Sequence, residues 1–252
     1  MDRPIPGAWN ATLHAARLGF IRASRGKVLY GSMILLALPY IGIAIASATG
    51  TTLDHEAQVA MMRAWTDTLL SLVAVLVAYG GVAEEVSRGS AVYFWTRPQP
   101  RWALPMGKFL ASSLLVIPAA LLLIVVGSAL VGSPVPAGKL ALAITLSALV
   151  HIALALAAGA LYPRHAVVTA LVAMAILDLA IYAIPGAAQT ISPVFHLRNL
   201  AGLLPPAGAL NKILPRPNVS ATTSVIVLLG QTILFLLVAA IRVTKWEYRP
   251  RT

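Results

Sequence analysis

The stretch KLALAITLSALVHIALALAAGALYPRHAVVTALVAMAILDLAIYAIP, residues 139–185, decides the fold of this chain. It holds two apolar runs, 139–161 and 166–185, on either side of the short turn PRHA. An apolar run of about 20 residues crosses a bilayer as a helix, because only a helix or a closed barrel satisfies backbone polar groups in lipid. The runs are continuous rather than alternating, which favours helices. Because the turn is short, we expect two antiparallel, neighbouring membrane helices.

The rest of the chain continues this pattern. Of its 252 residues, 59% are hydrophobic and only 11% are charged, whereas soluble domains carry about 25% charged residues. Little is left over for a soluble domain, so the sequence predicts one all-α, polytopic transmembrane domain over 1–252. The six predicted spans are 28–49, 66–83, 107–132, 139–161, 166–185 and 221–242.

The distribution of Lys and Arg predicts the orientation. The net charge is +11, and most basic residues lie on the side of the spans that also holds both termini. Positive charge concentrates on the cytoplasmic side of membrane proteins, so we expect both termini in the cytoplasm and the chain in the inner (cytoplasmic) membrane. This bias explains the charge without a nucleic acid partner. The basic residues on the opposite side are Arg63, Lys139, Arg198, Lys212 and Arg216.

The segment before the first span has a moderate amphipathic pattern. Residues 10–27 place Leu13, Ala16 and Phe20 on one side at helical spacing, with Arg17 among them. We interpret the segment as an interfacial helix on the inner leaflet, with its basic residues near anionic headgroups. The alternative is that this basic N-terminal segment is disordered.

The segment 186–220 is the longest predicted outer connection. It contains Pro193, Pro205, Pro206, Pro215 and Pro217 among apolar residues. Prolines prevent a complete span and the segment is too apolar for a solvated loop. We therefore expect an outer apolar loop with short helices packed against the rest of the protein.

The segment EEVSRGSAVYFWTRPQPRW, residues 84–102, interrupts the apolar pattern between the second and third spans. Arg88 follows Glu84 at a favourable helical ion-pair spacing, and Pro98 ends any helix. Exposed aromatics between charges suit a surface that docks another protein. An aromatic belt beside cytoplasmic basic residues would also explain Tyr93 and Trp95 without a partner.

This segment resembles the cytoplasmic motif of ABC transporter permeases of the ABC-2 type. In that motif an acidic residue ends the second span, Gly with Ser or Thr follows, and Gly-Lys opens the third span. The chain departs from the family by placing Tyr93, Phe94 and Trp95 where aliphatic residues are common. The matching residues are Glu84, Glu85, Arg88, Gly89, Ser90, Thr96, Pro98, Arg101, Gly107 and Lys108.

The resemblance implies a permease subunit of an ATP-driven exporter. Two copies of the chain, or this chain and a similar one, would form the membrane path, and a coupling helix in the segment would dock on each of two ATP-binding subunits. No phosphate-binding Gly-x-x-x-x-Gly-Lys-Ser/Thr occurs in the chain, so ATP and Mg²⁺ are expected in the partner, and the chain itself is not expected to be an enzyme. The residues expected to dock and couple are Glu84, Glu85, Arg88, Gly89, Tyr93, Trp95 and Pro98.

His151 and Asp178 are the ionisable residues deepest in the predicted spans. Counted from the PRHA turn, both lie at a depth of roughly 16–18 Å, at ~1.5 Å per residue, so they could meet. The pair could be a proton relay or part of a polar substrate path. We favour a structural role, in which the pair locks the fourth span to the fifth, because interhelical polar contacts commonly hold membrane helices together.

Other functional classes find less support in the sequence. A proton-coupled secondary transporter using His151 and Asp178 is the main alternative. A membrane-embedded enzyme lacks a recognisable nucleophile and base. Asp54, His55 and Glu56 are too close in sequence for one metal ion without an unusual turn, so no metal site is predicted. Nothing in the sequence indicates the exported substrate.

Overall fold

The computed structural model describes residues 7–50, 54, 56–57, 60, 64–87, 100–131, 136–184, 186–204 and 217–245, and these residues form only helices and their connections. The predicted all-α fold is therefore confirmed for the described part of the chain. The principal helices are α1 (Ala8–Ser24), α2 (Lys27–Ala48), α4 (Leu70–Ala78), α5 (Gly80–Ser87), α7 (Ala103–Val131), α8 (Ala137–Leu161), α9 (Ala166–Ala175), α11 (Pro193–Ala201) and α12 (Ala221–Lys245).

Short helical segments precede, follow or connect the longer helices. Two are single π-helical turns, η1 (Trp65–Leu69) before α4 and η3 (Ile176–Ala180) after α9. The remaining ones are η2 (Pro163–His165), α10 (Ile181–Ala183) and η4 (Ala187–Ile191).

Five helical stretches among the described residues are long and apolar enough to cross a membrane. A multi-pass membrane protein follows from them. The first predicted span, 28–49, falls on α2, whose described apolar part, Lys27–Pro39, is shorter than the others, so six spans remain a prediction. The five stretches are Trp65–Val86, Ala103–Leu122, Ala137–Leu161, Pro163–Ala183 and Ala221–Lys245.

Helix α8 is the centre of the bundle. It packs against α4, α7, α9, α11 and α12, and 78% of its most apolar window is buried within the protein. By contrast, the corresponding windows of Pro163–Ala183 and α12 are only 17% and 22% buried. Their exposed Leu, Ile and Val side chains suit contact with lipid tails. The expected neighbours 139–161 and 166–185 do pack together, as α8 against α9.

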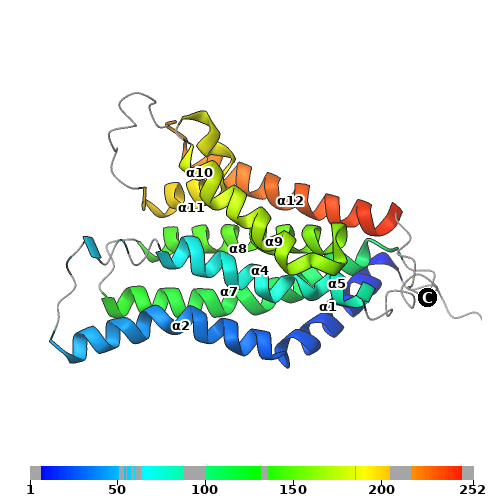
Figure 1. Cartoon of the computed structure of the whole chain (residues 1–252), viewed down its shortest axis with the longest axis horizontal. Coiled ribbons are helices and arrows are strands. Elements are labelled where there is room, and N and C mark those ends of the chain that lie inside the picture. The colour runs from blue at the N-terminus through cyan, green and yellow to red at the C-terminus, as the bar shows by residue number, and fades with distance from the viewer. Residues whose placement is uncertain are drawn as a thin grey trace, which may run out of the picture.

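Both ends of the described chain lie at the same end of the bundle. Figure 1 shows α1, α5 and the C-terminal end of α12 together, whereas α10 and α11 lie at the opposite end. We call these the α1 end and the α11 end. An even number of crossings requires this arrangement. That the α1 end faces the cytoplasm remains a prediction from the charge distribution.

The expected helix before the first span is present as α1, so a disordered lead is excluded for Ala8–Ser24. Its protein-facing side differs from the expected apolar side. Leu13 and Phe20 are exposed, whereas Ala16 is buried. The small residues make the protein contact because only they allow close packing, which leaves the larger apolar side chains on the outside.

The outer segment also contains the expected short helices. After α10 the chain turns at Gly186, with φ of +89°, into η4 and then α11. Helix α11 packs against α8 and α12, and its Phe195 and Leu197 are fully buried. The outer prolines between 205 and 216 lie outside the described residues.

Candidate functional site

Helix α1 is fixed to α7 by two facing stripes of small residues, one every four positions. A side-chain carbon added at Gly107 would lie 2.5 Å from Ala15 Cβ and 2.7 Å from the Thr12 carbonyl oxygen. Small residues at such spacing let helix backbones approach closely. The stripes are Ala11, Ala15 and Gly19 on α1 and Ala103, Gly107 and Ala111 on α7.

An ion triad beside these stripes ties three helices together. Glu85 of α5 accepts hydrogen bonds from Arg22 of α1 at 2.6 Å and from Lys108 of α7 at 2.8 Å, both at the same oxygen. The side chains of Glu85 and Lys108 are 6% and 8% exposed, whereas that of Arg22 is 46% exposed. We call Arg22, Glu85, Lys108 and Gly107 the joint. It fixes the start of α7 relative to the end of α5.

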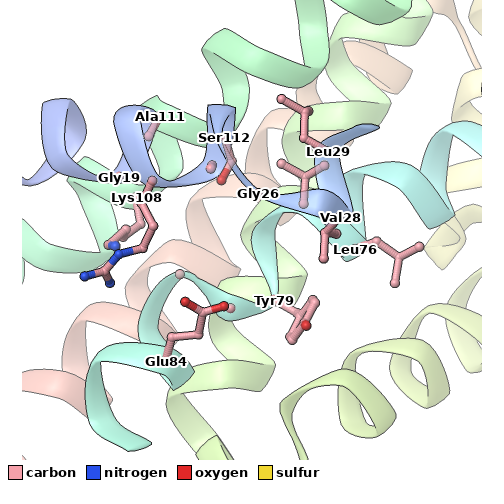
Figure 2. A pocket seen from close by; sticks show the side chains of 15 residues that line it. Gly19, Gly26, Val28, Leu29, Leu76, Tyr79, Glu84, Lys108, Ala111 and Ser112 are labelled. Carbon is pink, nitrogen blue, oxygen red and sulfur yellow. The ribbon is translucent and has the colours of Figure 1, made fainter. Parts of the chain in front are cut away.

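A cavity of about 190 Å³ lies beside the joint. Figure 2 shows Glu84 and Lys108 toward one side and Leu29 and Leu76 toward the other. Arg22 also lines the cavity. The cavity is therefore charged on the side of the joint and apolar on the other.

The structure describes two of the predicted docking residues, Glu84 and Glu85. Glu85 is buried in the joint, and Glu84 is half-buried at the cavity. Just past the segment, Arg101 donates a hydrogen bond of 3.5 Å to the Thr244 carbonyl oxygen, near the C-terminal end of α12. The other predicted docking residues, Arg88, Gly89, Tyr93, Trp95 and Pro98, lie outside the described residues.

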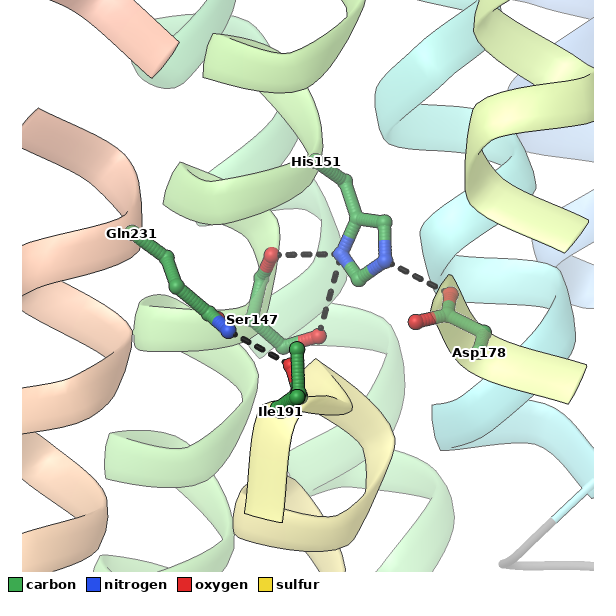
Figure 3. Close-up of polar contacts among 5 residues, drawn as sticks. All are labelled: Ser147, His151, Asp178, Ile191 and Gln231. Atoms are coloured by element: carbon green, nitrogen blue, oxygen red, sulfur yellow. Dashed lines mark hydrogen bonds and ion pairs between the residues drawn. The ribbon is translucent and has the colours of Figure 1, made fainter. Parts of the chain in front are cut away.

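The expected meeting of His151 and Asp178 is confirmed. His151 Nε2 lies 2.7 Å from Asp178 Oδ2, and its Nδ1 lies 2.7 Å from the Ser147 carbonyl oxygen (Figure 3). His151 is fully buried and Asp178 is 5% exposed. A hydrogen-bonded pair of this kind joins α8 to η3. It can hold the helices together and can also accept or release a proton.

A partly buried ion pair between Arg198 and Asp67 was also not predicted from the sequence. Arg198 Nε of α11 donates a hydrogen bond of 2.7 Å to Asp67 Oδ2 of η1. The Arg198 guanidinium also donates to the Tyr182 hydroxyl at 2.7 Å and lies 4.5 Å from the centre of the Tyr182 ring. Two features of the sequence could have indicated this pair: Asp67 lies at the outer start of the second span, and Arg198 lies within an apolar outer segment. Burial opposes the charge of Arg198, but the hydrogen bond and the negative charge of Asp67 outweigh it and raise the pKa of Arg198.

Both membrane aspartates lie in π-helical turns. Asp67 is the central residue of η1 and Asp178 the central residue of η3. π-helical turns inside α-helices occur frequently at functional sites. The α11 end is therefore a second candidate site.

A neutral histidine holds α11 to the start of α12. His196 Nε2 lies 2.7 Å from the Thr190 carbonyl oxygen, which can only accept, so Nε2 carries the hydrogen. Nδ1 then accepts from the Ser224 hydroxyl at 3.0 Å, and that hydroxyl oxygen accepts from Asn199 at 2.9 Å. Burial lowers the pKa of His196, although its bond to Thr190 acts in the opposite direction. The neutral form fits every contact in this network.

No group of three or more His, Cys, Asp or Glu side chains among the described residues could hold a metal ion. In the first outer loop, Asp54 Oδ1 accepts a hydrogen bond of 2.7 Å from the Ala57 amide. His55 lies outside the described residues, so the geometry of Asp54, His55 and Glu56 as a set is not described.

A comparison with curated proteins found no match to this sequence. A family described as "Protein of unknown function (DUF2705)" matches residues 28–249, from the start of α2 to beyond the end of α12. The match covers most of the chain, and the chain therefore belongs to the DUF2705 family.

Proposed function

We propose that this chain is the membrane-spanning permease subunit of an ATP-driven exporter of the ABC-2 type. Two permease chains, identical or similar, would form the path through the bilayer. Two copies of a separate ATP-binding subunit would hydrolyse ATP with Mg²⁺. The proposal starts from the resemblance of residues 84–108 to the coupling motif of that family.

The joint is the observation that supports this proposal most directly. The motif begins with an acidic residue and ends with Gly-Lys, and in the structure Glu85 and Lys108 form an ion pair at 2.8 Å. The intervening segment therefore starts and finishes at one fixed place. A motif whose two ends bind each other suits a loop that must transmit force, because a displacement of the loop reaches α5 and α7 together.

The joint would pass such a displacement to other helices. Arg22 connects Glu85 to α1, and Gly107 allows α1 to lie directly on α7. Arg101 connects the start of α7 to the end of α12. Closure of docked ATP-binding subunits would then shift a membrane dimer between two states, with these contacts moving as a unit. Glu85 would position the docking segment rather than touch the partner.

Co-purification tests the docking role. The chain is expressed with its neighbouring genes, isolated in mild detergent, and the bound proteins are identified. We expect an ATP-binding subunit that is lost when Tyr93 and Trp95 are both replaced by Ala. Trp9→Ala, at an aromatic side chain that is 66% exposed on α1, is the matched control and should retain the subunit. A chain that binds no ATP-binding subunit with any neighbouring gene would contradict the proposal.

The His151–Asp178 pair favours one alternative function, a proton-coupled secondary transporter. A buried carboxylate and imidazole 2.7 Å apart can exchange a proton across one hydrogen bond. The test uses liposomes that contain the purified chain and a pH-sensitive dye. Proton movement without ATP that is lost in Asp178→Asn would support this alternative. Full transport with unchanged pH dependence in Asp178→Asn would exclude it.

A further inference from the structure

The cavity beside the joint has the two kinds of wall that a lipid molecule requires. Lys108 and Glu84 lie toward one side of it and Leu29 and Leu76 toward the other (Figure 2). The lining residues come from α1, α2, α4, α5 and α7, or from the corners between these helices. The cavity is therefore a pocket between helices of the bundle, and its lining is amphipathic.

The charged side of the cavity has hydrogen-bond donors to spare. A guanidinium has five N–H donors and an ammonium has three. Arg22 donates one hydrogen bond to Glu85 Oε1, and Lys108 donates one to the same oxygen. Neither side chain donates a further hydrogen bond within the described part of the chain. Several donors therefore remain for the oxygen atoms of a ligand.

Positive charge is in excess around this side of the cavity. Gly26 lines the cavity at the corner between α1 and α2, and its neighbours Arg25 and Lys27 are both exposed. Together with the two cations of the joint, they outnumber the carboxylates of Glu84 and Glu85. Basic pockets between membrane helices bind the headgroups of anionic lipids. The balance of charge therefore selects an anionic ligand.

The position of the cavity along the bundle matches a lipid at a membrane surface. Glu84 lies two residues before the end of the membrane-length stretch Trp65–Val86, and Leu76 lies eight residues before Glu84. At ~1.5 Å per residue, the apolar side reaches about 12 Å deeper than the charged side. Val28 also lines the cavity and is 45% exposed, so the apolar side reaches the surface of the protein. A headgroup and its acyl chains lie in the same order.

The size of the cavity limits what it can enclose. Its volume of about 190 Å³ equals that of roughly six water molecules, at about 30 Å³ each. It can hold a phosphate with a small headgroup, whereas the acyl chains would lie outside it, against the exposed apolar side chains of α2. Glu84 accepts hydrogen bonds, which favours a headgroup that carries hydroxyl groups beside its phosphate.

We propose that the cavity beside the joint binds the headgroup of one anionic phospholipid, phosphatidylglycerol. Its phosphate oxygens would accept hydrogen bonds from Arg22 and Lys108, and its glycerol hydroxyls would donate to Glu84. Such binding is specific to one pocket, unlike the general attraction of basic residues to an anionic membrane surface. The inference goes beyond the proposed export function and does not rest on it.

Counting the lipids that stay bound tests the site. The full chain is purified in detergent, washed free of lipid, and mixed with phosphatidylglycerol or with phosphatidylcholine of the same acyl chains. Native mass spectrometry then counts the lipids retained on each chain. We expect a single phosphatidylglycerol to be retained at concentrations that leave phosphatidylcholine unbound.

Thermal unfolding provides a second measurement. A ligand that binds only the folded state raises Tm with its concentration. We expect a saturable rise in Tm with phosphatidylglycerol, followed by circular dichroism, and a much smaller one with phosphatidylcholine. Inorganic phosphate is the probe for a free anion and should raise Tm little, because it lacks the acyl chains that contact α2.

Variants locate the bound lipid. Arg22→Gln removes a charged donor, and we expect about tenfold weaker affinity, the usual size of effect for a hydrogen bond to a charged group. Arg17→Gln removes the same charge at an exposed position of α1 outside the cavity, so it is the matched control and should leave the affinity nearly unchanged. Ala23→Leu keeps every charge but fills part of the cavity, and it should abolish retention of the lipid. It replaces Arg22→Gln as the test if the loss of Arg22 reduces helix content.

Three results would overturn the proposal. Equal retention of phosphatidylglycerol and phosphatidylcholine would mean that the headgroup charge is not recognised. An equal rise in Tm with inorganic phosphate would mean that the ligand is a free anion. Full retention in Ala23→Leu would mean that the lipid binds the basic surface outside the cavity. None of these results depends on whether an ATP-binding subunit co-purifies, so failure here and failure of the export function are separable.

Discussion

The two ends of the bundle use buried charge in opposite ways. At the α1 end, Glu85 accepts from both Arg22 and Lys108, so two cations share one carboxylate. At the α11 end, Asp178 uses one oxygen for His151 and leaves the other without a partner among the described residues. The first arrangement fixes helices in place. The second leaves one carboxylate oxygen available as an acceptor.

The largest expected effect comes from breaking the joint at Glu85. Glu85→Ala leaves Lys108 buried without its carboxylate, and removing one partner of a buried pair typically costs about 3–5 kcal/mol. Denaturation in SDS, followed by circular dichroism, measures this loss. Glu56→Ala, at an exposed position, is the control and should change stability little. An equally small loss in Glu85→Ala would mean that the triad does not hold the helices together.

The next effect concerns the helix contact within the joint. Gly107→Ala places a carbon against the backbone of α1, where no side-chain rotation can relieve the contact, and overpacking of this kind costs about 1–3 kcal/mol. Gly230→Ala is the matched control, because a side-chain carbon there meets no atom within 4 Å. It should stabilise α12 by roughly 0.5–1 kcal/mol, the usual gain of Ala over Gly in a helix. Protease cleavage after α1 would report its detachment in Gly107→Ala.

A double-mutant cycle sharpens the comparison at the α11 end. Asp67→Asn and Arg198→Gln should each destabilise the chain, and the double variant should lose less than the sum of the two. For residues in one ion-pair network the coupling is about 0.5–3 kcal/mol. SDS denaturation of the four proteins measures it. Additive losses would show that the two side chains act independently, and that η1 is not held to α11 by this pair.

The smallest expected effect is a pH dependence at His196. Its pKa in the folded chain lies below the ordinary value of 6.5, so the unfolded chain binds the proton more readily. Stability from the neutral imidazole is therefore present above about pH 6.5 and is lost as pH falls through the lowered pKa. We expect the drop in Tm from about pH 7.5 to about 5 to be smaller in His196→Gln than in the wild type. Equal drops would mean that other groups cause the pH dependence.

The five membrane-length helical stretches were predictable because each is a continuous apolar run, and among their predicted starts that of the third span was the least accurate. It was expected at 107, where Gly-Lys interrupts the hydropathy, but α7 begins at Ala103. Pro105 lies in the first turn, where a missing amide hydrogen costs nothing. Lys108 then lies within the helix, because Glu85 supplies the charge that burial of a lysine requires.

The candidate sites were predictable only where depth could be counted along adjacent helices. His151 and Asp178 lie on either side of one tight turn, so equal counts placed them together. Asp67 and Arg198 are separated by 131 positions, and their pairing depends on how α11 folds back onto the bundle. Counting residues along the chain cannot predict how α11 folds back, because its position depends on the tertiary contact between α11 and α8.

Trp65 gives the α11 end its own optical probe. Its indole nitrogen donates to the Leu36 carbonyl oxygen at 2.9 Å, its side chain is 2% exposed, and it lies two residues before Asp67 in the same π-helical turn. Trp9 and Trp102 are 66% and 40% exposed. A rewinding of η1 would break the indole hydrogen bond and shift the emission of the one buried tryptophan among these three. The chain has five tryptophans, so the difference in emission between the wild type and Trp65→Phe isolates this signal and can follow rearrangements at the depth of Asp67 without an attached dye.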